Sequence, residues 1–190
     1  LTALSAVAAC GDAPRDGADT NGGTSPQPPA TGAPGGTPPA PTPSGPGTVR
    51  PAVLRTFPHD PNAFTQGLLF VNGELYESTG IVGESEIRQV DLATGAVRRR
   101  RPLPAPYFGE GIAVHDGRLY QLTWRHGKAF VYDLATFAPR DTLDYFGEGW
   151  GLTSDGESLI MSDGTARLRF LDPTTFAVRR TVDVRDGTSP

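Results

Sequence analysis

Apolar and polar positions alternate over short segments between residues 65 and 185, and turn residues separate these segments. The clearest pattern occurs three times, at residues 67–76, 111–120 and 151–160. Each copy contains a short apolar segment, then an Asn-Gly or Asp-Gly pair, then a second such segment. These pairs readily adopt the positive φ angles of a tight turn, so each copy is predicted to be a β-hairpin. No segment shows the 3.6-residue spacing of an amphipathic helix, and the pattern therefore predicts an all-β domain.

Two more predicted strands follow each hairpin. The third strands are expected at residues 87–90, 129–132 and 168–171, and the fourth around residues 97–99, 140–143 and 178–182. The turns between them begin at Asp91, Asp133 and Asp172. Four short strands that recur after 44 and then 40 residues are typical of the blades of a β-propeller.

One blade covers its faces only by packing on neighbouring blades. Propellers have at least four blades, so three such repeats do not close a ring. We therefore assign residues 51–190 to a propeller domain that is truncated at its C-terminus and holds about three to three and a half blades.

The first fifty residues have a different composition. Residues 1–9 are small and apolar and end at Cys10, and Val7-Ala8-Ala9-Cys10 resembles a bacterial lipobox. Residues 10–50 are rich in Pro and Gly and contain no aromatic residue, which is typical of an extended, disordered tether. The expectation is a signal-peptide remnant, a lipid on Cys10 and a domain held at a membrane of the bacterial cell envelope, on its periplasmic or outer side. The alternative is an apolar end with a chance cysteine.

Charge and composition exclude several classes of function. The net charge of −4 argues against a nucleic-acid-binding surface. A single cysteine excludes an intramolecular disulfide framework and a Cys-cluster metal site. The three histidines, His59, His115 and His126, do not have the spacing of metal ligands and are expected at the surface, so no metal or other cofactor is predicted.

The alignment of the repeats indicates a site. The residues directly before the repeat glycines are Gln66, Glu110 and Trp150. Two positions earlier stand Phe64, Phe108 and Glu148, and the second strands are followed by Gly80, Trp124 and Gly164. In a propeller these positions converge at one mouth of the central channel, where aromatic walls with a few polar groups form a small-ligand pocket. Each residue alone also fits a simpler role, because tryptophans often pack between blades and glutamates beside glycines often lie in solvated turns.

The segments around these residues resemble the glutamine cyclotransferase family of plants and bacteria. The motifs are Phe64-Thr65-Gln66-Gly67-Leu68, Tyr76-Glu77-Ser78-Thr79-Gly80, Phe108-Gly109-Glu110-Gly111-Ile112, Leu122-Thr123-Trp124, Gly149-Trp150-Gly151-Leu152-Thr153 and Met161-Ser162-Asp163-Gly164. The resemblance implies a five-bladed propeller and a metal-independent enzyme of the acyltransferase class. Its substrates would be peptides or proteins with an N-terminal glutamine, which becomes pyroglutamate with release of ammonia.

The resemblance also assigns roles to single residues. It implies that Glu110 is the general acid/base and that the substrate pocket is formed by Phe64, Gln66, Phe108, Trp124 and Trp150. An Asn and a Lys that complete the family's pocket are expected downstream of this chain. Glu148 is a weaker candidate for the acid/base, because it stands three residues before Gly151 whereas Glu110 directly precedes Gly111.

Two other functions fit the same pattern. One is a non-catalytic envelope lipoprotein that binds a peptide or protein partner at the channel mouth. The other is a calcium-dependent, lactonase-like propeller, which would need convergent acidic or amide ligands at the axis.

Overall fold

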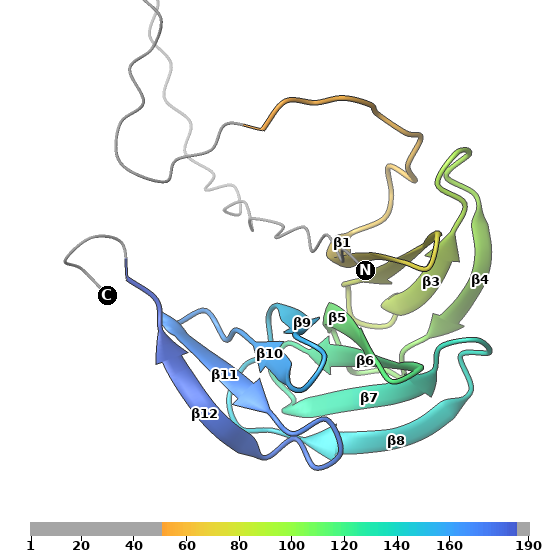
Figure 1. Ribbon diagram of the computed structural model, residues 1–190. Coiled ribbons are helices and arrows are strands. Elements are labelled where there is room, and N and C mark those ends of the chain that lie inside the picture. Colours follow the sequence, from red (N-terminus) through yellow and green to blue (C-terminus); the bar gives the residue numbers. More distant parts are fainter. Residues whose placement is uncertain (1–50, 186–190) are drawn as a thin grey trace, which may run out of the picture. The chain divides into compact units, whose positions relative to one another are not determined.

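The computed structural model describes residues 51–185, and this part of the chain forms three four-stranded antiparallel sheets (Figure 1). Among the described residues, those from Phe57 onward form one compact unit, and residues 51–56 belong to another. The predicted signal remnant, Cys10 and the tether lie outside the described residues. No helix in the described part of the chain has the length and apolar character needed to cross a membrane.

Each sheet takes its strands in sequence order, and the predicted strands are confirmed. The first sheet contains β1 (Thr65–Val71), β2 (Glu74–Thr79), β3 (Glu86–Val90) and β4 (Val97–Pro102). The second contains β5 (Gly109–His115), β6 (Arg118–Thr123), β7 (Lys128–Asp133) and β8 (Pro139–Asp144). The third contains β9 (Leu152–Ser154), β10 (Leu159–Met161), β11 (Arg167–Leu171) and β12 (Val178–Asp183).

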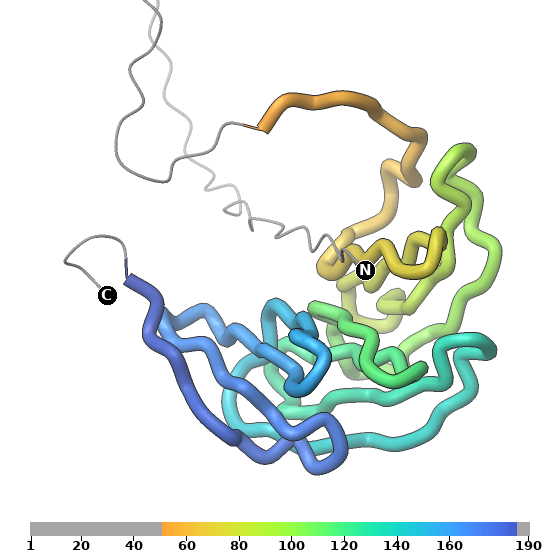
Figure 2. The backbone as a smooth tube through the Cα atoms, in the orientation of Figure 1, coloured from red at the N-terminus to blue at the C-terminus, as the bar shows by residue number. Residues whose placement is uncertain are grey.

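The three sheets are successive blades of a partial β-propeller, as the repeats predict. The first strands of neighbouring blades lie beside each other, β1 against β5 and β5 against β9, and the later strands fan outward from them (Figure 2). Each blade thus begins at the centre of the unit and ends at its outside. Residues just before each first strand therefore meet on one side of the centre.

Two of the three predicted tight hairpins are present. Asn72 and Gly73 join β1 to β2, Asp116 and Gly117 join β5 to β6, and all four residues have positive φ angles. The third hairpin differs from the prediction, because four residues, 155–158, separate β9 from β10. Asp155 causes the difference: its Oδ1 accepts hydrogen bonds from the backbone N–H groups of Glu157 and Ser158, which favours the wider loop.

The repeat glycines allow the first strands to approach closely. A Cβ atom on Gly67 would lie 2.9 Å from the backbone nitrogen of Ile112, and one on Gly111 would lie 2.6 Å from that of Leu152. The Gly111 N–H also donates a 2.8 Å hydrogen bond to the carbonyl of Trp150, which joins the second blade to the third. Glycine is therefore required where blade meets blade at the centre.

Two apolar clusters hold the blades together. Phe137, after β7, packs with Tyr76 and other side chains of the first blade, and Phe176, after β11, packs with Tyr120 of the second. Both phenylalanines are buried although their φ angles are positive, 60° and 61°. The equivalent residue of the first blade is Gly95, whose Cα faces the backbone of Pro58 and His59. A segment preceding β1 thus lies where the other blades place an aromatic ring against a neighbour.

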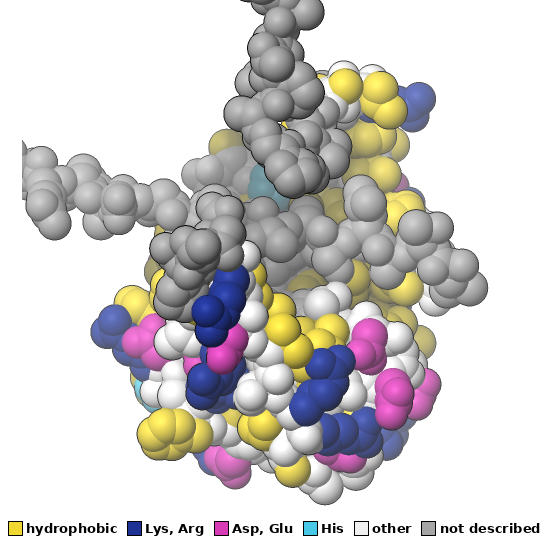
Figure 3. All heavy atoms as spheres, turned by 60° about the vertical axis from the view of Figure 1, so that its left-hand side comes forward, with side chains coloured by type: hydrophobic (Ala, Val, Ile, Leu, Met, Phe, Trp, Pro, Cys, Tyr) yellow, Lys and Arg dark blue, Asp and Glu magenta, His cyan; other side chains and the backbone are white. Residues whose placement is uncertain are grey.

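The outer strands are charged and exposed. The same ion pair recurs in every blade and links the turn aspartate to an arginine of the fourth strand: Asp91 with Arg98, Asp133 with Arg140, and Asp172 with Arg179. Basic and acidic side chains are accordingly mixed on the face in Figure 3.

Candidate active site

Glu110 is the second residue of β5, and its side chain lies at the centre of the unit. Only 8% of the residue is exposed. Gln66, on the neighbouring strand β1, donates from Nε2 to the Glu110 Oε1 atom over 3.3 Å. Because Gly111 is hydrogen-bonded to Trp150, the backbone also brings Glu110 next to the entry of the third blade.

The surroundings of Glu110 favour its protonated form. Burial raises the pKa of its carboxyl to about 8, and the negative charge of Glu148 adds to this effect. A carboxyl group with this pKa holds a proton at neutral pH and can give it up or take it back near the same pH. This behaviour is typical of a general acid/base rather than of a solvated turn residue.

Aromatic rings line the site beside Glu110. The rings of Phe64 and Phe108 meet edge to face with centroids 6.1 Å apart, and Phe108 lies 5.7 Å from Trp124. Gly80 makes room for this row, because a Cβ at that position would collide with the Phe108 ring. In the first blade the position equivalent to Trp124 is Gly80. A side chain does not fit there, because the Phe108 ring of the next blade occupies the space.

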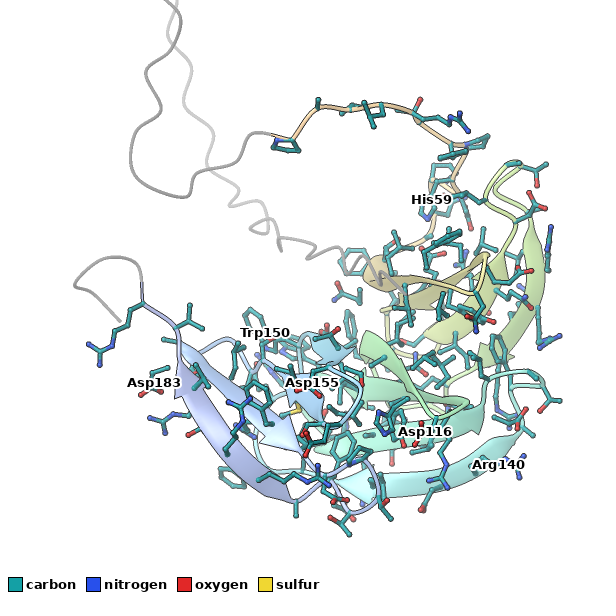
Figure 4. The ribbon with its side chains drawn as sticks, in the orientation of Figure 1. His59, Asp116, Arg140, Trp150, Asp155 and Asp183 are labelled. Atoms are coloured by element: carbon teal, nitrogen blue, oxygen red, sulfur yellow. The ribbon has the colours of Figure 1, made fainter. Side chains whose placement is uncertain are left out.

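Trp150 continues the aromatic wall from the third blade. Its ring lies against Gly164, where a Cβ would come within 2.7 Å of the indole Cζ2. Figure 4 shows Trp150 beside β9 on the inner side of the sheets, whereas Asp183 and Arg140 lie on the outer strands. The indole Nε1–H groups of Trp150 and Trp124 both donate hydrogen bonds to the Glu148 carboxylate.

The site residues expected from the sequence form two groups of contacts, which are linked by the backbone bond from Gly111 to Trp150 and by the charge of Glu148 near Glu110. Gln66 contacts Glu110, Phe64 contacts Phe108, Phe108 contacts Trp124, and Glu148 links Trp124 to Trp150. Glu148, which the sequence indicates as a second candidate acid/base, instead has a lowered pKa. The main causes are the hydrogen bonds from Trp150 and Trp124.

The three histidines do not come together, although His126 lines a hollow that Glu148 also borders. His59 bonds to Glu77 over 2.9 Å, and His126 packs on the ring of Tyr107. His115, which was expected at the surface, is largely covered, with 11% of its side chain exposed. It is held between blades, with Nδ1 3.1 Å from the hydroxyl of Ser154. Within residues 51–185, no three His, Cys, Asp or Glu side chains are grouped so as to hold a metal ion.

A layer of buried polar side chains lies against Gly109, the residue before Glu110, and sequence reasoning missed it. The backbone N–H of Gly109 donates to the Ser85 hydroxyl over 3.0 Å, and Gln121 donates to Ser78 over 2.9 Å. Gln121 is fully buried. The available signal was Gln121, a polar residue between Tyr120 and Leu122. Such groups keep their place inside a protein only when they are hydrogen-bonded.

A propeller with a buried carboxyl group among aromatic rings defines a class of small-ligand-binding or catalytic propellers. A sequence model of glutamine cyclotransferases matches residues 31–190, so the chain belongs to the glutamine cyclotransferase family. It is 44% identical to an Arabidopsis thaliana glutaminyl-peptide cyclotransferase over 128 residues. This match covers 66% of the chain and 40% of the plant protein.

Solved structures agree with this placement. The crystal structure of Myxococcus xanthus glutaminyl cyclase matches with a TM-score of 0.68 and 38% identity, over 73% of this chain and 59% of that one. The Pan2 WD40 domain of Neurospora crassa matches with a TM-score of 0.52 and 13% identity. The match covers 63% of this chain and 36% of the Pan2 domain, and it shows the propeller fold alone. The chain therefore spans about two fifths of the plant relative and about three fifths of the bacterial structure.

Proposed function

We propose that the protein is a glutaminyl-peptide cyclotransferase, which converts an N-terminal glutamine to pyroglutamate and releases ammonia. The observation that carries the proposal is the buried Glu110 carboxyl, with a pKa of about 8, beside a wall of aromatic rings. Membership of the family and the names of the two similar proteins support it.

The first task of such a site is to hold the substrate folded. The attacking α-amine and the attacked side-chain carbonyl belong to the same glutamine, so catalysis requires a conformer that brings them together. Phe64, Phe108, Trp124 and Trp150 would pack on the methylene groups of this conformer and exclude water. Gln66, held by Glu110, would offer its amide to the substrate's carboxamide.

The second task is the transfer of one proton. The neutral amine attacks the side-chain carbonyl carbon, a C–N bond forms, and the bond to the amide nitrogen breaks. The amine nitrogen loses a proton and the leaving nitrogen gains one, so the products are a lactam and ammonia. Glu110 would give its proton to the leaving nitrogen and accept the amine's proton, ending in its starting state. This sequence of steps requires no metal or other cofactor.

The decisive experiment measures ammonia released from a glutaminyl peptide by the protein and by Glu110→Gln. Loss of a general acid/base reduces the rate about 10²–10⁴-fold. Glu157→Gln is the control, because this carboxyl is exposed on the wide β9–β10 loop. Full activity in Glu110→Gln would refute the assignment of Glu110. Peptide binding without any ammonia release by the unaltered protein would favour the non-catalytic alternative.

We further propose that the protein is exported and anchored to the cell envelope by a lipid on Cys10. The support is the lipobox-like segment 7–10 and the Pro- and Gly-rich composition that follows it. Metabolic labelling of a bacterial host with a radioactive fatty acid should mark the protein, and Cys10→Ser should abolish the label. Equal labelling of both would contradict the anchor.

A further inference from the structure

One carboxylate oxygen joins the two tryptophans of the site. Glu148 Oε2 accepts a hydrogen bond from Trp124 Nε1 over 2.8 Å and another from Trp150 Nε1 over 2.9 Å. Trp124 follows the second strand of the second blade, and Trp150 precedes the first strand of the third. The two indoles thus come from different blades and share a single acceptor.

The second carboxylate oxygen of Glu148 is also engaged. Its Oε1 accepts from Arg125 Nε over 3.2 Å, and the Arg125 guanidinium lies 3.7 Å from the centre of the Trp124 ring. Trp124 is therefore held at its nitrogen by an anion and covered on its face by a cation. Three donors keep Glu148 ionised, in agreement with its lowered pKa.

Packing alone does not fix the orientation of the Trp150 indole, whereas Trp124 also lies against Phe108 and Arg125. Trp150 is 38% exposed, and the residue under its ring is a glycine, which provides no side-chain wall. A partly exposed indole turns about two side-chain bonds unless a hydrogen bond selects one rotamer. The bond to Glu148 supplies that selection for Trp150 and adds to the contacts that hold Trp124, before any substrate arrives.

We propose that Glu148 is a positioning residue, which presets the two indoles as the wall that receives the substrate's glutamine side chain. The proposal rests on the proposed function for the identity of the ligand. Glu148 acts through Trp124 and Trp150 and is not assigned to the proton transfer. Pre-arranged walls reduce the ordering that binding must impose, so loss of this carboxylate weakens substrate binding.

Ring positioning is tested without any substrate, because the sequence contains only two tryptophans, Trp124 and Trp150. Their fluorescence therefore comes from these two rings alone. We expect Glu148→Ala to shift the emission to longer wavelength and to increase quenching by acrylamide, with Glu148→Gln in between because its amide oxygen remains an acceptor. Asp144→Asn, which alters an exposed carboxylate paired with Lys128, is the matched control and should match the unaltered protein.

Circular dichroism and the thermal midpoint confirm that the variants are folded. Emission and quenching of folded Glu148→Ala or Glu148→Gln that equal those of the unaltered protein would overturn the positioning role. Graded changes in the two variants, with none in Asp144→Asn, would support it.

Substrate binding is tested in a Glu110→Gln background, where turnover is suppressed. A glutaminyl peptide is titrated while tryptophan emission is followed. Removal of hydrogen bonds to a charged group should raise the dissociation constant about tenfold or more in Glu148→Ala, with partial rescue in Glu148→Gln. Equal affinity with and without the Glu148 carboxylate would overturn the proposal.

The outcomes separate the two proposals. If the Glu110→Gln protein binds no glutaminyl peptide, the proposed function is contradicted, and so is any role of Glu148 in substrate binding. The quenching experiment then still shows whether Glu148 positions the rings. A Glu110→Gln protein that binds the peptide and depends on Glu148 supports both.

Discussion

Glu110 and Glu148 come from neighbouring loop-and-strand junctions, yet their surroundings move their pKa values in opposite directions. Burial raises the pKa of Glu110, and hydrogen bonds from two indoles lower that of Glu148. Two carboxyl groups close enough to influence each other thus have different protonation states at neutral pH. This division suits one group to proton transfer and the other to fixed electrostatic support.

The raised pKa of Glu110 has a consequence for stability. The native state holds this proton up to a pH of about 8, whereas the unfolded chain loses it near 4.5. The native state therefore loses stability as pH rises from about 4.5 to 8. We expect Glu110→Gln to be more stable than the unaltered protein by several kcal/mol at pH 8.5, because each pKa unit corresponds to about 1.4 kcal/mol, and to lose that advantage at pH 4.

Denaturant unfolding at several pH values measures this difference. Glu157→Gln, with its exposed carboxyl, should show no comparable gain. A difference between Glu110→Gln and the unaltered protein that stays constant from pH 4 to 8.5 would show that Glu110 is not a buried acid.

At the level of single elements, the first strands of the blades are the most constrained. Gly67 and Gly111 lie where a side chain would meet the backbone of the next blade, and Gly151 faces only the hydroxyl of Ser162. The same repeat position thus tolerates an added side chain in the third blade better than in the first two. A backbone neighbour cannot move aside, whereas a hydroxyl group at the end of a side chain can rotate.

Gly111→Ala should therefore destabilise the protein by about 3 kcal/mol, and Gly151→Ala by about 1 kcal/mol or less. The first value follows from an added Cβ that meets the backbone of residues 150–152. Chemical denaturation of both variants gives the comparison. Equal and small losses would mean that the second and third blades can separate at the centre without cost.

Sequence reasoning was most successful at this level. Alternating apolar positions and Asn-Gly or Asp-Gly pairs identify strands and tight turns, because both depend on local backbone preferences. It failed at the third hairpin, where Asp155 competes for the backbone N–H groups and widens the loop. The presence of the aspartate was visible, but which hydrogen bonds it makes depends on the position of both strands.

At the level of the whole unit, repetition predicted which site residues meet but not how they contact. Gln66 meets Glu110, and a backbone bond joins Gly111 to Trp150. The shared oxygen of Glu148 could not be foreseen, because it depends on the rotamers of two indoles in different blades. The covered state of His115 was missed for a similar reason, since its partner lies on the next blade.

A few aromatic rings hold the blades together, so the removal of one ring should lower the stability of the protein substantially. Phe176 is buried against Tyr120 and Tyr145 of the second blade. We expect Phe176→Ala to reduce the free energy of unfolding by about 3–5 kcal/mol through loss of burial and the cavity left behind. Phe146→Ala is the control, because this ring is 90% exposed and its loss should change stability little. Equal thermal midpoints for the two variants would contradict this account of blade packing.

Gly95 occupies the repeat position that the other two blades fill with phenylalanine, and the backbone of Pro58 and His59 passes over it. This contact, which we call the Gly95 seam, limits how the chain can be rearranged by protein engineering. Any circular permutation or added module that places a full blade ahead of Phe57 must exchange this glycine for an aromatic residue. The strand-free stretch that now crosses the seam would have to be rerouted at the same time.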